Sequence, residues 1–203
     1  MTLYLLFLLM ATATVFSPGP GVVMTLSNAL RDGVRGSFGG ILGIAAGALV
    51  VAALSATTLG AVVAASALAF TLLQFAGAAY LAYLGIRLWR APVFRFAEKP
   101  PRATNAARRF AQGLSLQLTN PKAIFFFLSA LPQFIDPARD YPLQFATLVF
   151  TYAALVVLIH SVYAACAQRA RRWLTSERGG RLLNRVAGAM FLLFAATLAA
   201  ANR

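Results

Sequence analysis

Charged residues are scarce in this chain of 203 residues, and they are unevenly placed. They make up 11% of the sequence while hydrophobic residues make up 60%, which is too little charge to cover a soluble domain. No charged residue precedes Arg31, and none lies between Arg35 and Arg87. The second run is too long for one helix across a hydrocarbon core of about 30 Å, but it suits two. The composition therefore predicts an integral membrane protein.

Cysteine and acidic residues are rarer still. The single cysteine, Cys166, excludes an intramolecular disulfide, a CxxC redox pair and a cysteine-rich metal site. With no carboxylate expected inside the bilayer, we expect neither a metal nor a cofactor, and an embedded enzyme, a redox conduit or a metal-ion exporter is disfavoured. All the acidic residues lie in or beside expected loops: Asp32, Glu98, Asp136, Asp140 and Glu177.

Basic residues are abundant by contrast, and a net charge of +13 would indicate a nucleic-acid partner in a soluble protein. Here they gather in alternate connections between apolar runs, so the positive-inside rule explains them and we expect no nucleic-acid partner. The rule predicts a multi-pass protein of the bacterial inner membrane with both termini outside. No basic stretch precedes the first apolar run, so we interpret residues 1–30 as a retained span rather than a cleaved signal peptide.

Apolar runs predict an all-α membrane protein of six transmembrane helices. A cluster of Ser, Thr and Gly near residues 54–60 predicts the turn between the second and third helices. The expected spans are residues 3–29, 37–56, 62–88, 110–135, 143–167 and 183–201.

These spans divide into two groups of three. Residues 1–88 form the first group, residues 110–203 form the second, and the basic segment 89–109 joins them in the cytoplasm. Because each group holds an odd number of helices, the second crosses the membrane in the opposite direction to the first. The sequence thus predicts two inverted three-helix repeats.

Proline interrupts the first helix of each predicted repeat near its middle, at Pro18 and Pro20 in one and at Pro121 in the other. Each proline deprives the carbonyl four residues earlier of its helical donor, and a new half-helix starts after it. Freed carbonyls suit an ammonium group and half-helix N-termini suit a carboxylate, so the pair predicts a site for an amino acid. The alternative is two kinks that only shape the bundle. The freed carbonyls belong to Thr14, Phe16 and Gln117, and the N–H groups expected to lack partners lie near Val22–Met24 and Ala123–Phe125.

Two embedded ionisable residues accompany these breaks. Lys122 has no expected carboxylate partner, so it either bonds to freed carbonyls or snorkels, or it meets the carboxylate of the substrate. His160 is either a packed histidine or the proton-coupling residue. The complete set of substrate-binding candidates is Ser17, Pro18, Gly19, Pro20, Gly21, Gln117, Asn120, Pro121 and Lys122, with Asn28 nearer the cytoplasmic end.

Glycines also form one face of the second predicted helix. Gly39, Gly43 and Gly47 recur at four-residue spacing, which favours close packing of a neighbouring helix. That neighbour comes either from the other repeat or from another protomer, so a homo-oligomer is possible.

Several of these motifs together resemble the lysine-exporter and homoserine/threonine-efflux (LysE/RhtB) family of bacterial inner-membrane proteins. The matching segments are "SPGPG" at 17–21, "FAGAAYLAYLGIRLWR" at 75–90, "FAQGLSLQLTNPKAIFFFLSALPQF" at 110–134 and "LLNRVAGAMFLLFAATLAA" at 182–200. The resemblance covers nearly the whole chain. It implies a six-helix secondary transporter that exports amino acids or small derivatives and is driven by protons.

One departure from the family pattern bears on the substrate. Members that export basic amino acids are expected to carry an acid in the second span, and residues 43–54 contain none. A neutral amino acid is therefore favoured over a basic one. The expected partners are an amino acid, protons and the lipid bilayer. The rival hypothesis is a membrane scaffold or sensor subunit that transports nothing.

Overall fold

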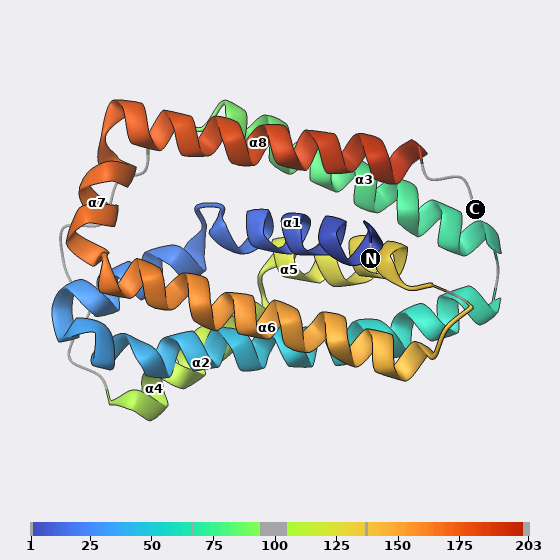
Figure 1. Cartoon of the computed structure of the whole chain (residues 1–203), viewed down its shortest axis with the longest axis horizontal. Helices are drawn as coiled ribbons and strands as arrows, with labels where there is room; N and C mark the ends of the chain where they lie inside the picture. The colour runs from blue at the N-terminus through green and yellow to red at the C-terminus, as the bar shows by residue number, and fades with distance from the viewer. Residues whose placement is uncertain (1, 66, 94–104, 137, 201–203) are drawn as a thin grey trace.

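Helices make up the regular structure in the part of the chain that the computed structural model describes, residues 2–65, 67–93, 105–136 and 138–200 (Figure 1). This part is therefore all-helical, which is consistent with a helical membrane protein. Residues 94–104 of the predicted linker lie outside it. The elements are α1 (Thr2–Phe16), α2 (Pro20–Ala65), α3 (Ala67–Trp89), α4 (Ala106–Leu118), α5 (Pro121–Phe125), the π-helical turn η1 (Phe126–Ala130), the 3-10 turn η2 (Leu131–Phe134), α6 (Tyr141–Ala165), α7 (Ala167–Thr175) and α8 (Glu177–Ala200).

Three helical stretches among the described residues are long and apolar enough to cross a membrane. They are Pro20–Ala56, Tyr141–Ala165 and Glu177–Ala200, and a shorter apolar helix runs over Leu3–Phe16. This composition supports a multi-pass membrane protein. The six-span topology stays a prediction, because length and composition single out only these three.

Helix α2 is bent into two arms. Its backbone leaves helical geometry at Gly33, where φ is 71° and ψ is −178°. Glycine permits this turn because it has no Cβ to clash at positive φ. The first arm continues onward from α1 after the interruption at residues 17–19, and the second arm runs back along the molecule (Figure 1).

The turn predicted near residues 54–60 is wrong. Helix α2 continues through these residues to Ala65, and α3 begins at Ala67. Ser and Thr hydroxyls within a helix can bond back to a carbonyl one turn earlier, so a cluster of them does not end the helix.

Two further segments differ from the predicted spans. The fourth span, residues 110–135, is divided among α4, α5, η1 and η2. Helix α7 lies in the predicted connection between the last two spans, and α8 begins at Glu177 rather than near residue 183. Departures from α-helical geometry such as η1 are frequent near functional sites.

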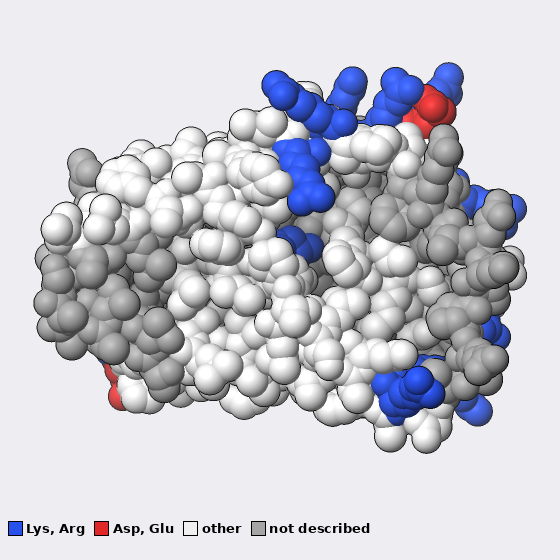
Figure 2. All heavy atoms as spheres, turned by 180° about the vertical axis from the view of Figure 1, so that it is seen from behind, with Lys and Arg blue, Asp and Glu red and all other residues white. Residues whose placement is uncertain are grey.

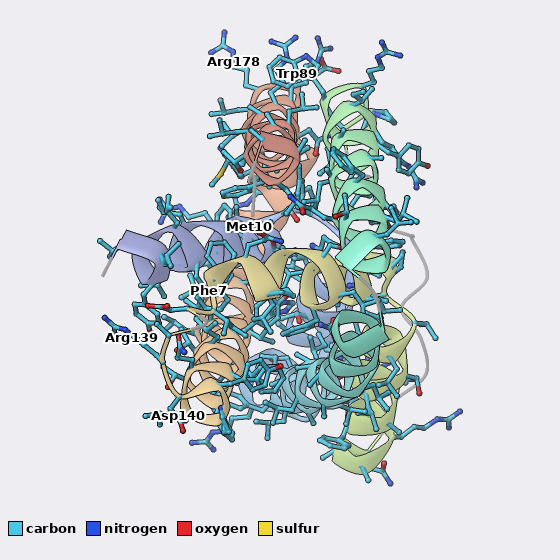
Figure 3. All side chains as sticks on the ribbon, turned by 90° about the vertical axis from the view of Figure 1, so that its right-hand side faces the viewer. Phe7, Met10, Trp89, Arg139, Asp140 and Arg178 are labelled. Carbon is cyan, nitrogen blue, oxygen red and sulfur yellow. The ribbon has the colours of Figure 1, made fainter. Side chains whose placement is uncertain are left out.

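The two halves of the chain pack against each other through the glycine face of α2. A Cβ on Gly43 would overlap the Phe110 carbonyl of α4, and one on Gly39 would lie 2.6 Å from the Ala106 carbonyl oxygen. This face therefore seats α4, from the other half of the chain. When the molecule is viewed down its long axis, α3 and α8 lie on one side and α2, α4 and α6 on the other (Figure 3). Helices α1 and α5 lie between these two groups.

Charge is distributed unevenly over the surface. In the view of Figure 2, the Lys and Arg side chains lie from the middle of the molecule to its right-hand end, where α2 bends and α7 lies, and the left-hand third shows none. Helix α1 begins and α8 ends toward the opposite end from α7 (Figure 1). The distribution fits the positive-inside pattern on which the predicted orientation depends.

Candidate functional site

A small cavity lies where the two interrupted regions meet. Its volume is about 30 Å³, which leaves room for a few water molecules but not for an amino acid. Its lining comes from both halves of the chain. The lining residues are Thr14, Val15, Ser17, Gly19, Pro20, Gly21, Val22, Ile44, Gln117, Asn120, Lys122, Tyr152, Val156 and His160.

Lys122 reaches from α5 to the end of α1. Its Nζ atom donates to the Thr14 carbonyl at 2.6 Å and to the Ser17 hydroxyl at 2.8 Å, with the Ser17 carbonyl at 3.5 Å. Because Pro18 has no N–H, the Thr14 carbonyl lacks its helical donor, and the Lys122 ammonium replaces it. The sequence left open whether Lys122 binds a freed carbonyl, snorkels or meets the substrate. In this structure it binds the freed carbonyl of Thr14.

The second freed carbonyl of this region is also bound from the other half of the chain. Pro20 leaves the Phe16 carbonyl without a helical donor, and the Tyr163 hydroxyl of α6 donates to it at 2.9 Å. The rings of Phe16 and Tyr163 stack with their centroids 5.4 Å apart. The end of α1 is therefore fixed by residues more than a hundred positions away.

The second interrupted region satisfies its own backbone instead. The Asn120 side chain accepts from the Lys122 N–H at 3.1 Å, and the Asn120 carbonyl accepts from the N–H groups of Ala123 and Ile124 at 3.0 and 3.1 Å. The Gln117 carbonyl accepts from the Asn120 N–H at 3.1 Å. The prediction of unpaired N–H groups at Ala123–Phe125 is therefore wrong, because asparagine caps the half-helix itself.

Unpaired N–H groups occur at the start of α2, one position earlier than predicted. The Val23 N–H donates to the Gly19 carbonyl at 3.1 Å, whereas those of Gly21 and Val22 have no acceptor among the described residues. Gly21 and Val22 both line the cavity. A helix N-terminus with free N–H groups attracts an anionic group.

His160 lines the cavity from α6 and is only 4% exposed. Its Nδ1 atom lies 2.7 Å from the Thr25 hydroxyl of α2. Its ring also faces the start of α2, since a Cβ built on Gly21 would lie 3.3 Å from its Cε1 atom. The residue is thus both packed by a hydrogen bond and adjacent to the cavity.

The lining contains most of the residues named from the sequence. Pro18 and Pro121 are absent from it, and Asn28 lies farther along α2 beside Gly40, whose built Cβ would be 3.2 Å from its Nδ2 atom. Sequence reasoning missed Tyr152 and Tyr163 of α6 and the Thr25 partner of His160. Nothing in the local pattern around these three distinguishes them from packed residues of an apolar helix.

An aromatic cluster packs behind Tyr152, which lines the cavity. Tyr152 packs against Phe126 and Phe127 at centroid distances of 4.9 Å each, and Phe126 lies 6.1 Å from Phe7 of α1. Phe7, Phe126 and Phe127 are all buried. Tyr152 therefore joins the cavity to a buried aromatic cluster, and polar groups beside such an apolar region interact more strongly than in water.

A model of the LysE type translocator family matches residues 12–202, almost the whole chain. The protein belongs to this family. The resemblance to LysE/RhtB exporters is thereby confirmed, and this LysE-family protein is a membrane transporter rather than an enzyme.

Named relatives cover nearly the full length of this LysE-family protein. An uncharacterized membrane protein of Vibrio cholerae is 37% identical, over 93% of this chain and 92% of its own. The homoserine/homoserine lactone efflux protein of Salmonella typhimurium is 34% identical, over 97% and 95%. The leucine efflux protein of Klebsiella pneumoniae is 28% identical, over 97% and 94%. No solved structure matches the chain.

Proposed function

We propose that this protein exports a neutral amino acid or a small derivative across the bacterial inner membrane, and that the solute binds between the two interruptions. The observation that carries the proposal is the pairing of groups in one cavity. The Thr14 carbonyl and the Ser17 hydroxyl already hold an ammonium group, that of Lys122. Gly21 and Val22, whose N–H groups have no acceptor among the described residues, line the same cavity. Together they suit the two ends of a zwitterion.

The named relatives narrow the chemistry of the solute. Homoserine, homoserine lactone and leucine share an amino group and have no charged side chain, and the lactone has no free carboxylate. Recognition of an ammonium group therefore accommodates all three. No carboxylate occurs among the described residues that line the cavity, which favours a neutral side chain over a basic one.

The cavity must widen for such a solute to enter. We propose that two inverted repeats, 1–88 and 110–203, move against each other about the cavity, with the segment 89–109 joining them in the cytoplasm and both termini outside. The packing supports this pairing: the second arm of α2 meets α4, α6 meets α1 and the first arm of α2, and α3 meets α8 through Gly85 and Gly188. If the two halves are exchanged, the contact of α2 with α4 becomes that of α6 with α1, and the contact of α3 with α8 stays the same. This is the pattern expected of two repeats.

We further propose that export is driven by proton antiport, with His160 as a proton-coupling residue. Its support is its position, because it lines the cavity from α6 and also contacts the start of α2 through Thr25. Homo-oligomerisation is not required by the glycine face, which α4 occupies.

Counterflow in proteoliposomes tests the function. Vesicles loaded with unlabelled leucine, homoserine or homoserine lactone should take up the labelled solute, and an inward proton gradient should drive concentrative export. His160→Ala should weaken the dependence on the gradient, and Arg139→Gln, at an exposed ion pair with Asp136, is the matched control. Absence of exchange across a broad panel of amino acids would favour the scaffold or sensor hypothesis.

A further inference from the structure

The ammonium group of Lys122 occupies the acceptors that the proposed function assigns to the ammonium group of the solute. The inference that follows rests on that function. Nζ lies 2.6 Å from the Thr14 carbonyl and 2.8 Å from Ser17 Oγ, and a Cβ on Gly19 would lie 3.7 Å from it. A solute ammonium bound at the same carbonyl would have to displace it.

Two ammonium groups cannot share this place. The cavity measures about 30 Å³, and the described residues of its lining include no carboxylate that would neutralise a second positive charge. Two like charges this close together at a partly buried site repel each other strongly, because water screens them less there than in bulk solution. The titratable groups that line the cavity besides Lys122 are Tyr152 and His160, both from α6. The binding of a cationic amine therefore requires that Lys122 move away, lose its charge, or do both.

We propose that Lys122 carries the proton that is exchanged for the solute, its ammonium and the ammonium of the solute alternating at the Thr14 carbonyl and the Ser17 hydroxyl. On the cytoplasmic side, Lys122 releases one proton to water, its neutral amine leaves the acceptors, and the solute ammonium binds. On the outer side the solute leaves, Lys122 takes one proton from water, and its ammonium returns. Each cycle moves one proton inward and one solute outward.

His160 lines the same cavity as Lys122. Its imidazole is a base that can pass the proton between Lys122 and water. The Thr14 carbonyl keeps a donor after one ammonium leaves and before the other binds, because Ser17 Oγ also donates to it at 2.9 Å. The site thus remains hydrogen-bonded while Lys122 is neutral, which permits the intermediate in which neither ammonium is bound.

Two substitutions at Lys122 separate the proposal from a role in binding the carboxylate of the solute. Lys122→Met is always neutral, so counterflow of homoserine lactone should persist while concentrative export on a proton gradient is lost. Lys122→Arg keeps its proton under all these conditions, so both activities should be lost. Arg139→Gln, exposed and distant from the cavity, is the control for reconstitution. Concentrative, gradient-dependent export by Lys122→Met would overturn the proposal.

A carboxylate role gives a different pattern. In that case Lys122→Met would raise the KM for homoserine and leave the KM for homoserine lactone unchanged, because the lactone has no free carboxylate. Under our proposal the substitution affects both solutes alike. A rise confined to homoserine therefore contradicts it.

The wild-type protein provides a test that does not depend on any variant folding. Addition of homoserine or leucine to detergent-solubilised protein, weakly buffered with an indicator dye, should release about one proton for each solute bound, as linkage requires. The apparent Kd should rise about tenfold for each pH unit of acidification while Lys122 is protonated. Solute binding without proton release would overturn the proposal. A failure of the wild type to bind or exchange any amino acid would instead reject the function itself.

Discussion

The two interruptions differ in where their backbone groups find partners. After α4, the chain turns at Asn120, whose side chain and carbonyl bind the N–H groups that follow. After α1, the freed carbonyls of Thr14 and Phe16 bind Lys122 and Tyr163, which belong to the other half of the chain. The second interruption is complete in itself, whereas the first depends on distant residues.

This difference indicates which interruption can change during transport. Local caps persist when two halves of a protein move apart, because donor and acceptor move together. The contacts of Lys122 and Tyr163 with α1 join separate elements, so any relative motion of α1 against α5 or α6 must break or exchange them. We therefore expect the second interruption to be a rigid support and the first to be the part that responds to solute.

The largest effect should follow from forcing the two interruptions apart. Gly43→Leu adds a side chain where even a Cβ overlaps the Phe110 carbonyl, so α2 and α4 must separate. Overpacking of this kind costs about 1–3 kcal/mol or more, and here backbone rather than a flexible side chain is in the way. We expect a lowered melting temperature in detergent and loss of counterflow. Leu42→Ile, on the exposed neighbouring residue, should change neither.

A smaller loss is expected when the first interruption loses one of its distant partners. Tyr163→Phe removes the hydroxyl that donates to the Phe16 carbonyl and leaves that partly buried acceptor unpaired, at a cost of about 1 kcal/mol. We expect a lowered melting temperature together with a slower rate of counterflow. Tyr83→Phe, on an exposed side chain of α3, is the control and should have little effect. Equal rates for Tyr163→Phe and the wild type would show that this contact does not matter for transport.

Local rules predicted much of this region from the sequence. Proline at positions 18, 20 and 121 identifies which carbonyls lose their donors, and a cavity lined by both interruptions includes most of the residues predicted to bind solute. These inferences succeed because the missing N–H of proline has a consequence at a fixed distance along the chain.

Residues whose partners lie far away in sequence were not predictable in the same way. Tyr163 and Thr25 form hydrogen bonds with residues of other helices, and no local sequence pattern predicts these bonds. The N–H groups after Pro121 are not unpaired as expected, because Asn120 caps this half-helix. The turn expected near residues 54–60 was wrong because a helix tolerates Ser and Thr, whose hydroxyls can bond to a carbonyl one turn earlier.

The self-contained character of the second interruption can be tested by removing its cap. Asn120→Ala should lower stability by about 0.5–2 kcal/mol, the usual value of an N-cap. Asn105→Ala is a matched control, because Asn105 caps α4 in the same way with its side chain on the Arg108 N–H at 2.8 Å. Both variants should melt earlier by a similar amount, but only Asn120→Ala should reduce counterflow. A loss of counterflow in both would mean that cap stability alone determines the activity.

The smallest expected effect on stability comes from one hydroxyl at the first interruption. Ser17 and Ser37 are both fully buried, and each donates to the carbonyl three residues earlier, at 2.9 and 2.7 Å. Losing this bond should cost about 0.5–1.5 kcal/mol in either variant, and Ser17→Ala should melt slightly lower because it also loses the bond from Lys122 Nζ. Ser17 alone also accepts from Lys122 Nζ, so only Ser17→Ala should weaken the binding of a solute ammonium and raise the KM for counterflow. Equal KM values for Ser17→Ala and Ser37→Ala would mean that the acceptor pair at the end of α1 does not bind the solute, and the asymmetry between the two interruptions would then be structural only.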